Sequence, residues 1–414
     1  MKLALEKTME HRHNKFYYRL TQLLSGIVSR TLFKCEVRRN ELKGKKGPFV
    51  VIANHQAALD FTNLIGLTKE EMIFVISNAF YRSLPFKKIM DKIGVIPKQQ
   101  FQTSLKDIRS IKSAVEQGEI LVIYPAGLMC EDGLCTPIPH TTYQFLKWLG
   151  ADVYMAKVSG TYFVAPKWSQ KKRPGKTYVD VYKIFDKEEL AELDMSEIIE
   201  RTRRNLDFDA YREQEELRIK YRGGDNLEGL EYVLYKCPHC KSEHGMKAEK
   251  NKIFCTECGY AEESDEYGFL HKIGEIGEEI RYVSDWSKMI YSGVLEKLCS
   301  GGDVYMKLPC DLEVLYGGAG KWKDCGKCTV TLTREGFTLS NTLYERYADT
   351  LIRIDHFASL PFIPGDSFEI QHGNDVLRCH PKNQYDVMRV INNVKALYEL
   401  DERNDPYDSV HSKK

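Results

Sequence analysis

Residues 49–60 read FVVIANHQAALD, and this stretch decides the fold. Its first five residues are apolar and predict a short buried strand, which stops at Asn54 and His55. In α/β folds ligands bind beyond the carboxyl ends of strands, so His55 stands at a position that carries chemistry. Asp60 follows five residues later, a spacing too long for one face of a regular helix. We therefore expect His55 in the loop and Asp60 one turn into the next helix, pointing back toward it.

The alternation of strand and helix patterns continues beyond this stretch. Short apolar runs lie at 72–77, 120–124, 153–158 and 178–184. Helical patterns fall between them, notably at 104–117, and this rhythm is typical of an α/β domain. We place that domain at residues 49–222, because a Gly-Gly-Asp-Asn turn at 223–226 marks a boundary.

Residues 1–48 are predicted to form amphipathic helices with basic residues on them. The apolar residues at helical spacing are Phe16, Tyr17, Leu20, Leu23, Leu24, Ile27, Val28 and Leu32, and the basic residues among them are Lys15, Arg19 and Arg30. Such a helix can rest in lipid headgroups or pack on the protein's own core, since the periodicity is the same in both cases. The sequence has no apolar run of 18 residues and no signal-peptide pattern, so any contact with a membrane is expected at its surface.

The sequence after the boundary predicts two smaller units. Paired cysteines define a module at 230–262, a helix at 275–300 leads onward, and 301–402 contain short strands followed by one helix. Several strands closed by a terminal helix predict a mainly-β, barrel-like domain. Its architecture resembles that of a pleckstrin-homology or GRAM domain. That likeness rests on no motif, and it suggests docking to a membrane or a protein by analogy alone.

Length and composition set broad limits. A chain of 414 residues is expected to form two or three domains. With 43% hydrophobic and 29% charged residues, it is globular and not disordered. Lys plus Arg number 60 and Asp plus Glu number 59, so the overall charge gives no case for a nucleic-acid partner.

Four of the 12 cysteines form two Cys-x-x-Cys pairs separated by 14 residues. They are Cys237, Cys240, Cys255 and Cys258. This spacing predicts a structural zinc ribbon, in which four thiolates close a tetrahedron and leave no open position for catalysis. Reduced cysteines, two disulfides, or His239 or His244 as a ligand are the alternatives. Cys325 and Cys328 form a third tight pair, which we interpret as chance neighbours on a strand. The scattered remaining cysteines indicate a reducing compartment.

His55 and Asp60 have a natural joint role. A neutral imidazole can take the proton from a hydroxyl as that hydroxyl attacks an activated acyl carbonyl. A carboxylate on the other ring nitrogen fixes the tautomer and stabilises the imidazolium that forms. Of the 11 histidines, His55 alone has Asp at the fifth position after it. The spacing by itself is equally compatible with a structural histidine and an Asp that caps a helix.

Four segments of the chain resemble, in order, the motifs of the glycerol-phosphate and lysophosphatidate acyltransferase family. They are FVVIANHQAALD at 49–60, IMDKIGVIPKQQ at 89–100, ILVIYPAGLMCEDG at 120–133 and VYMAKVSGTYFVAPKW at 153–168. The family has Asn-His, four residues and Asp in the first, Gly-x-Ile in the second, Phe-Pro-Glu-Gly-Thr-Arg in the third, and a strand leading to Gly in the fourth. The resemblance covers roughly residues 15–185. It implies an α/β acyltransferase with His55 as catalytic base and Asp60 as its partner.

The resemblance also implies an acceptor site, and there the sequence departs from the family. By position, the substrate-binding residues are expected to be Asn54, Lys98, Gln100, Pro125, Ala126 and Gly127. Ala126 stands where the family usually has Glu, Met129 where it has Arg, and Lys98, Gln99 and Gln100 where an Arg is usual. An Arg fork is the natural partner of a phosphate, whereas Lys98 supplies only a point charge.

Two interpretations of the acceptor site follow. Either Lys98 and backbone donors around Gly127 hold a phosphate, or the acceptor is not lysophosphatidate. In the second case Glu131 and Asp132 lie close enough in sequence to bind hydroxyls of another acceptor. The simpler interpretation of these two residues is a polar turn.

The sequence thus predicts an O-acyltransferase of phospholipid synthesis that needs no metal for catalysis. Its expected partners are an acyl donor (acyl-carrier protein, acyl-CoA or acyl phosphate), a lipid acceptor and a membrane surface, with zinc as a structural cofactor. We expect a cytoplasmic protein on the inner face of the membrane. The alternative is a catalytically weak relative that acts as a lipid-binding or scaffold protein, because the acceptor residues are altered. A zinc-ribbon nucleic-acid protein has little support from the near-neutral charge.

Overall fold

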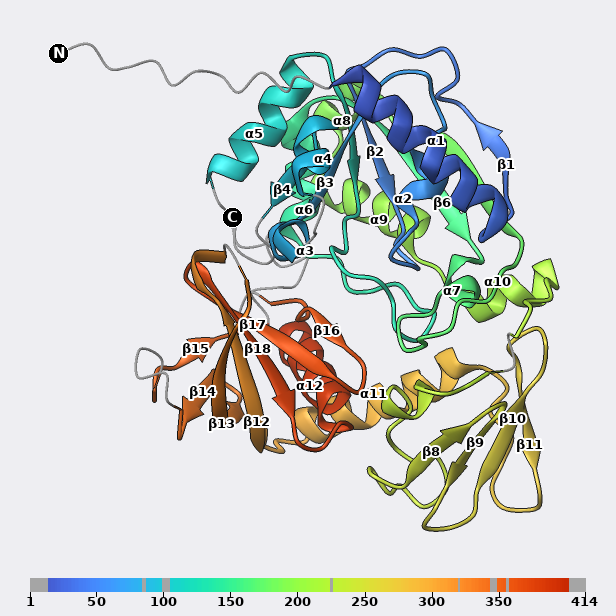
Figure 1. Ribbon diagram of the computed structural model, residues 1–414, viewed down its shortest axis with the longest axis vertical. Coiled ribbons are helices and arrows are strands. Elements are labelled where there is room, and N and C mark those ends of the chain that lie inside the picture. Colours follow the sequence, from blue (N-terminus) through green and yellow to red (C-terminus); the bar gives the residue numbers. More distant parts are fainter. Residues whose placement is uncertain are drawn as a thin grey trace.

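The computed structural model describes residues 14–83, 87–98, 105–223, 226–318, 321–342, 348–354 and 357–401. Figure 1 shows an α/β part, a small sheet, and a larger C-terminal sheet with one helix against it. None of the helices in the described part of the chain is long and apolar enough to cross a membrane.

A seven-stranded mixed sheet forms the centre of the α/β part, in the order β1-β7-β6-β2-β5-β3-β4. Its strands are β1 (Cys35–Asn40), β2 (Phe49–Ala53), β3 (Met72–Ser77), β4 (Ile96–Lys98), β5 (Ile120–Ile123), β6 (Asp152–Ser159) and β7 (Thr177–Phe185). Strands β6, β2, β5, β3 and β4 all run parallel, and only β7 and β1 run the other way. The carboxyl ends of the five parallel strands therefore lie at one edge of the sheet.

Helices cover both faces of this sheet. Val50 and Ile52 of β2 pack with residues of α5, α6, α8 and α9 on one face. Phe49, Val51 and Ala53 pack with α1 and α2 on the other. Because β2 is buried on both faces, it reads in the sequence as a continuous apolar run. The helices of this part are α1 (Lys15–Thr31), α2 (Phe61–Leu64), α3 (Asn78–Ser83), α4 (Lys87–Lys92), α5 (Leu105–Glu116), α6 (Thr141–Leu149), α7 (Thr161–Val164), α8 (Lys187–Glu192), α9 (Met195–Leu206) and α10 (Ala210–Leu217).

The five strands predicted between residues 49 and 184 are confirmed as β2, β3, β5, β6 and β7, and the helix predicted at 104–117 is α5. A strand nevertheless lies within 1–48, where helices were predicted. Strand β1 pairs with β7, and its middle residues are exposed because it is an edge strand. Its sequence, CEVRRN, has little apolar periodicity, so the pattern that identifies buried strands was absent.

The cysteine-paired module is a four-stranded antiparallel sheet. Its strands are β8 (Met246–Glu249), β9 (Lys252–Cys255), β10 (Ala261–Ser264) and β11 (Leu270–Ile273), in the order β11-β10-β9-β8. A short 3-10 helix, Leu230–Tyr232, precedes it, and α11 (Val283–Cys299) follows it. Trp286 of α11 is fully buried against Tyr260, and its indole N–H donates to the carbonyl of Lys236. The module and α11 are therefore packed together directly beside the first cysteine.

The C-terminal part is one curled antiparallel sheet with α12 (Asp386–Leu400) against it. Its strands are β12 (Tyr305–Leu315), β13 (Lys323–Thr333), β14 (Gly336–Ser340), β15 (Ile352–Arg353), β16 (Phe362–Ile363), β17 (Ser367–His372) and β18 (Asp375–Pro381), in the order β15-β14-β13-β12-β18-β17-β16. Strand β12 pairs with both β13 and β18, which joins the first four strands to the last three. The predicted likeness to a pleckstrin-homology or GRAM domain stays a prediction.

Cys325 and Cys328 both lie on β13 and are both buried. Residues three apart on a regular strand point to opposite faces. A bulge opposite Asp311 to Glu313, with Gly326 at φ +75°, turns both side chains inward. Neither belongs to a group of side chains that could hold a metal ion among the described residues.

Candidate active site

The end of β2 is fixed to its neighbour by Asn54. The Asn54 amide donates to the carbonyl of Val158 and accepts from its N–H, both at 2.8 Å. Asn54 is 3% exposed, and its side chain continues the ladder between β2 and β6 past the point where β2 stops. Its predicted role in substrate binding stays a prediction. In the structure, its amide fixes the direction in which the chain carries His55.

Asp60 lies directly before α2 and is fully buried. Its Oδ2 accepts from the N–H groups of Gln56 (2.8 Å) and Ala57 (2.9 Å) and lies 3.0 Å from Nδ1 of His55. The sequence predicted Asp60 one turn into the helix. Instead it stands at the start of α2, caps no N–H of that helix, and folds back onto the turn before it. The expected contact between His55 and Asp60 is present, although its backbone support was not foreseen.

The contact with Asp60 decides which nitrogen of His55 is available. Oδ2 of Asp60 already accepts from two backbone N–H groups, so it is an acceptor toward Nδ1 as well. In neutral His55 the proton therefore lies on Nδ1, and Nε2 carries a lone pair. The His55 side chain is 19% exposed, so Nε2 is the nitrogen that can take a proton from a bound hydroxyl.

Tyr124, directly after β5, stacks on the His55 ring with the ring centroids 4.2 Å apart. Its hydroxyl is buried and has no hydrogen-bond partner among the described residues, and the same holds for Oδ1 of Asp60. Burial raises the pKa of Tyr124 well above its ordinary value, and the charge of Asp60 adds to that effect. The orientation of the imidazole ring is thus fixed by Tyr124, which stacks on its face, and by the carboxylate of Asp60, which contacts its edge at Nδ1.

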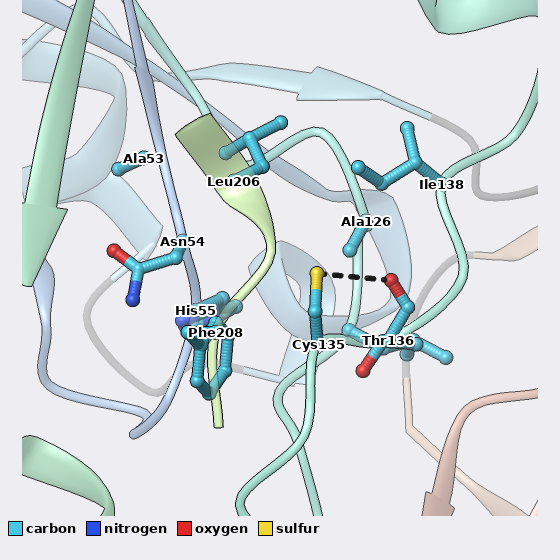
Figure 2. A pocket seen from close by; sticks show the side chains of 10 residues that line it. Ala53, Asn54, His55, Ala126, Cys135, Thr136, Ile138, Leu206 and Phe208 are labelled. Atoms are coloured by element: carbon cyan, nitrogen blue, oxygen red, sulfur yellow. Dashed lines mark hydrogen bonds between the residues drawn. The ribbon is translucent and has the colours of Figure 1, made fainter. Parts of the chain in front are cut away.

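A pocket opens beside His55 at the carboxyl edge of the sheet (Figure 2). It holds about 220 Å³ of empty space, its open mouth included. Because that volume counts open solvent at the mouth, the enclosed space beside His55 is far smaller, and the pocket is not a chamber for a whole lipid. It is lined by Ala53, Asn54, His55, Ala126, Leu128, Cys135, Thr136, Ile138, Leu206 and Phe208.

Sequence reasoning found three of these lining positions, Asn54, His55 and Ala126, and missed the others. Cys135, Thr136 and Ile138 follow the third motif closely, so their nearness to His55 could have been inferred from the loop after β5. Leu206 and Phe208 come from the end of α9 and carry no motif. No signal in the sequence places them there.

The described residues that were predicted to bind an acceptor lie at the same edge of the sheet as His55, but they differ in how close they are to its pocket. Ala126 lines the pocket, Pro125 is buried, and Gly127 adopts φ +68° and donates its N–H to the carbonyl of Tyr124. That N–H is therefore already used within the turn. Gln100 lies outside the described residues.

Lys98 ends β4, three strands away from β2. The strand register places it level with Asn54, since Ser77 pairs with Lys98 and Phe74 lies level with Val51 through β5. Neighbouring strands are about 4.8 Å apart, so the two backbones are about 14 Å apart. Burial lowers the pKa of Lys98, and the charge of Asp107 opposes this. Lys98 faces the same edge as His55 but does not line its pocket.

Glu131 and Asp132 were interpreted most simply as a polar turn, but both are buried, and neither lines the pocket. They are 2% and 7% exposed and contact the C-terminal half of the chain. Glu131 forms an ion pair with Lys395 of α12. Asp132 accepts a hydrogen bond from the hydroxyl of Ser287 of α11 (2.5 Å).

The four paired cysteines meet in space, with their Sγ atoms all within 4.8 Å of one another. Two Sγ–Sγ distances, Cys237 to Cys258 and Cys240 to Cys255, are 3.7 Å. A tetrahedral zinc ion with Zn–S bonds of about 2.3 Å requires sulfur atoms about 3.8 Å apart. The donor set and its spacing thus fit a tetrahedral metal ion held by four thiolates.

Each knuckle closes by the same turn. The N–H of Lys241 donates to the carbonyl of Cys237 (3.1 Å), and the N–H of Gly259 donates to that of Cys255 (3.0 Å). Lys241 and Gly259 both have positive φ, at +64° and +77°. Lys241 is in a conformation that costs a non-glycine residue energy, and the repeated geometry accounts for its presence there.

Comparison with known proteins finds one matching family model and a similar solved structure. The family model of acyltransferases matches residues 34–164, so the chain carries an acyltransferase domain over these residues. No curated protein matches the sequence. Among solved structures, the chain is similar to the 1-acyl-sn-glycerophosphate (LPA) acyltransferase PlsC from Thermotoga maritima. The two are 18% identical, with 49% of this chain and 83% of that chain covered and a TM-score of 0.38.

Proposed function

We propose that the protein transfers a fatty acyl group from an activated donor to a hydroxyl of a glycerolipid-type acceptor in phospholipid synthesis. The observation that carries this proposal is the contact of His55 with the buried Asp60, at the start of a domain that matches the acyltransferase family. The donor in this proposal is an acyl thioester or an acyl phosphate.

His55 and Asp60 account for each proton in such a transfer. Nε2 of His55 takes the proton of the acceptor hydroxyl while its oxygen attacks the acyl carbonyl. Asp60 stabilises the imidazolium that forms, because its carboxylate faces Nδ1. The tetrahedral intermediate then collapses, the bond from carbonyl carbon to the donor's sulfur or phosphate oxygen breaks, and His55 returns the proton to the leaving group. An ester forms and a thiol or phosphate is released.

The acceptor proposed here is a glycerolipid with a charged group. We propose that this group is held more loosely than by the Glu and Arg residues that are usual in the family. Ala126 lines the pocket where a carboxylate is usual, and Lys98 places a positive charge at this edge of the sheet. The reach of a lysine side chain is about 6 Å, so Lys98 meets a group several ångströms from the reacting hydroxyl and not the hydroxyl itself. This favours an acceptor with an anionic headgroup over a small alcohol.

We propose that the protein works on the inner, cytoplasmic face of a membrane, with α1 against the lipid. One side of α1 exposes large apolar side chains, with Phe16, Leu23 and Leu24 at 71%, 62% and 55% exposure. Tyr18 on the opposite side is fully buried in the α/β core. Exposed apolar patches of this kind mark contact surfaces, and Lys15, Arg19 and Arg30 on the same helix favour anionic lipid.

A vesicle assay tests the membrane proposal. Replacing Leu23 and Leu24 together by Ser is expected to weaken binding to vesicles of phosphatidylglycerol and phosphatidylcholine about tenfold or more, because two exposed apolar side chains no longer enter the lipid. Ile363→Ser, which replaces an apolar residue of the C-terminal sheet that is 46% exposed, is the control and is expected to bind like wild type. Equal binding by all three proteins would contradict a role for α1.

We propose zinc as the metal of the four-cysteine group, in a structural role. Four thiolates fill all four positions of a tetrahedral ion, so the site adds no open position for chemistry. Metal analysis of the purified protein is expected to give one zinc per chain, and none in a Cys240→Ala, Cys258→Ala variant.

The main experiment compares wild type with His55→Ala. Lipid mass spectrometry of cells making each protein is expected to show acylated products only with wild type. Purified wild type is expected to transfer palmitoyl groups from palmitoyl-CoA or palmitoyl phosphate to lysophospholipids at least 10³-fold faster than His55→Ala. Equal transfer by the two proteins would refute the mechanism. Tight lipid binding without turnover would instead favour the scaffold alternative, which the altered acceptor residues suggest.

A further inference from the structure

The segment after β5 joins the candidate active site to the C-terminal half of the chain. We name residues 126–136 the active-site loop. Four of its residues line the pocket beside His55: Ala126, Leu128, Cys135 and Thr136. The position of this loop therefore sets the shape of the space in which a substrate meets Nε2 of His55.

One side of the active-site loop is hydrogen-bonded to the backbone of His55 and Gln56. The N–H of Cys130 donates to the carbonyl of His55 (3.1 Å), and the Cys130 thiol lies 3.8 Å from the carbonyl of Gln56. Cys130 is fully buried. A shift of the loop at this residue would act on the backbone of His55 through a direct hydrogen bond.

The other side of the loop is held by two helices from far along the chain. The carboxylate of Glu131, next to Cys130, pairs with Lys395 of α12, whose side chain is 11% exposed. Burial acts to lower the pKa of Lys395, but the charges of Glu131 and Asp132 raise it above its ordinary value, so the ammonium stays charged. The hydroxyl of Ser287 on α11 holds Asp132.

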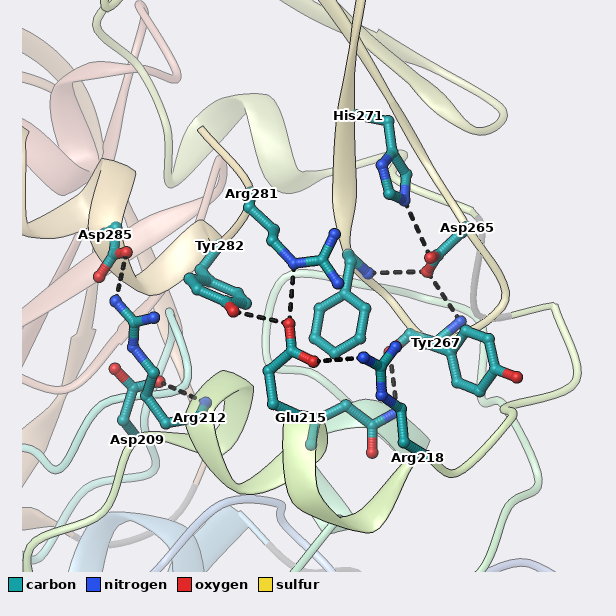
Figure 3. A network of polar contacts seen from close by, with 12 residues as sticks. Asp209, Arg212, Glu215, Arg218, Asp265, Tyr267, His271, Arg281, Tyr282 and Asp285 are labelled. Atoms are coloured by element: carbon teal, nitrogen blue, oxygen red, sulfur yellow. Dashed lines mark hydrogen bonds and ion pairs between the residues drawn. The ribbon is translucent and has the colours of Figure 1, made fainter. Parts of the chain in front are cut away.

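The two helices are themselves fixed to the rest of the molecule. Figure 3 shows the ion pairs that tie α10 to α11 and to the segment before it. Arg212 of α10 pairs with Asp285 of α11 (2.7 Å), and Glu215 of α10 accepts from Arg281 (2.8 Å) and Tyr282 (2.7 Å). Helix α12 packs on α11. The groups that hold the loop thus stand on two helices, of which α11 is bonded to the α/β part and α12 packs on α11.

We propose that the C-terminal part takes a direct role in acyl transfer by holding the active-site loop through the buried ion pair of Glu131 and Lys395. Lys395 is then a positioning residue for His55, 264 residues away from the carboxylate it holds. This inference rests on the proposed acyltransferase function. It assigns the C-terminal part a task inside the reaction, apart from any docking to membrane or protein.

The test uses the full chain and a pair of charge-free substitutions. Removing one partner of a buried ion pair leaves an uncompensated charge and can prevent folding, whereas replacing both partners is often neutral for stability. We therefore choose Glu131→Gln with Lys395→Met as the main variant and Lys395→Arg as the conservative one. Lys382→Met is the matched control, because it removes an exposed ion pair with Asp311 in the same part of the chain.

Two readouts separate positioning from general stability. The first is palmitoyl transfer from palmitoyl-CoA to a lysophospholipid, with kcat and KM determined well below the unfolding temperature. We expect kcat of the double variant to fall 10- to 100-fold with KM within twofold of wild type, Lys395→Arg to recover at least a third of kcat, and Lys382→Met to equal wild type. The second is the NMR signal of the His55 ring, assigned by its absence in His55→Ala, which is expected to shift in the double variant alone.

The outcomes are distinct. A folded double variant with wild-type kcat and an unshifted His55 signal overturns the proposal. The proposal is also overturned if kcat falls only in proportion to a lower unfolding temperature, while the His55 signal does not shift. If wild type transfers no acyl group, the proposed function fails, but the His55 signal still decides whether Lys395 positions that ring.

Discussion

At the scale of single residues, Asp60 shows how the proposed catalytic pair is held in place. Its Oδ2 is fixed by two backbone N–H groups before it meets His55, so the carboxylate does not depend on the histidine for its position. The imidazole is in turn confined by Tyr124. The pair is pre-organised, which is what a general base requires in order to act without rearrangement.

Asp60→Asn tests the charge of this group while keeping its shape. The Asn oxygen still accepts from the two N–H groups and from Nδ1, but it does not stabilise an imidazolium. We expect kcat to fall about 10²- to 10⁴-fold. Stability should fall by about 1–2 kcal/mol, because the new NH₂ group meets no acceptor where Oδ1 lies unpartnered. Steady-state kinetics and thermal unfolding measure both effects, with the exposed Asp311→Asn as control. Undiminished kcat would contradict the role of Asp60.

Lys167 provides a prediction of pH dependence. Its ammonium lies 3.3 Å from the Phe362 ring centroid, buried and without a hydrogen-bond partner among the described residues. Burial lowers the pKa of Lys167 to about 8, although the charge of Glu131 raises it. The folded state therefore binds this proton less tightly than the unfolded chain, whose lysine has an ordinary pKa of about 10.4. The free energy of unfolding must therefore rise as the pH goes from about 8 to about 10.4. Below pH 8 the buried charge lowers the free energy of unfolding by up to roughly 3 kcal/mol.

Lys167→Met removes that cost. We expect the free energy of unfolding to increase by about 1–3 kcal/mol at pH 7, with the gain shrinking between pH 8 and 10. Denaturant unfolding at several pH values measures it. Lys171→Met, which removes only an exposed ion pair with Glu228, is the control and should change little at any pH. A destabilised Lys167→Met protein at pH 7 would show that the ammonium makes favourable contacts that outweigh its burial.

At this scale the sequence predicts groups that act over short separations. His55, Asp60 and the four cysteines were identified because their spacing is local and their chemistry is specific. Glu131 was placed in a polar turn instead, because nothing in the local pattern distinguishes a buried carboxylate from an exposed one. Its partner, Lys395, is 264 residues away, and single-sequence reasoning has no access to that pairing.

At the scale of elements, the four-cysteine module and α11 form one unit. The Trp286 indole donates to the carbonyl of Lys236 (2.9 Å), and Lys236 directly precedes Cys237 of the four-cysteine group. The ring also packs on Tyr260, two residues after Cys258. The fully buried Trp286 is therefore a reporter of the four-cysteine group.

Removing the metal is expected to loosen this unit. Structural zinc contributes about 10–16 kcal/mol in small metal-dependent modules, most of which is folding free energy. Treatment with a strong chelator should shift the fluorescence of Trp286 to longer wavelength as water reaches the indole, and added zinc should reverse the shift. A Trp286→Phe protein, which should lack the change, identifies the signal. Unchanged fluorescence after complete zinc removal would show that the module folds without metal.

Elements were predictable where burial imposes a period. Strand β2 and its parallel neighbours were recognised from their continuous apolar runs, because helices cover both faces of each. The edge strand β1 did not, since its exposed side chains follow no apolar pattern. The bulge at Gly326 also escaped prediction, because the two buried cysteines on β13 break the period of two.

At the scale of the whole molecule, the parts share an apolar cluster that lies beside the two clusters of the α/β sheet. A single apolar cluster runs from Tyr162 of the α/β part through Trp286 of α11 to Ile391 of α12. Domains that pack through an extensive apolar surface do not move freely against each other. The domain boundaries predicted from the sequence mark changes of pattern, and the packing in the structure continues across them.

Truncation tests this continuity. A chain that ends at residue 300 keeps the acyltransferase domain and the cysteine module but loses the apolar partners of α11 and the ion pair of Glu131. We expect it to be insoluble or to unfold at least 10 °C below the full chain, and calorimetry of the full chain to give one cooperative transition. A soluble truncated protein with wild-type acyl transfer would show that the parts are independent.

The long separation between Glu131 and Lys395 also has a consequence in time. A ribosome adds about 5–20 residues per second, so the 264 residues between the two side chains take roughly 13–50 s to make. For the later part of that interval the α/β part is fully synthesised, but Glu131 still lacks Lys395 as its ion-pair partner. In the nascent chain the ion pair that holds the active-site loop therefore cannot form until α12 has been made. The proposed site is complete only after translation has passed the last helix.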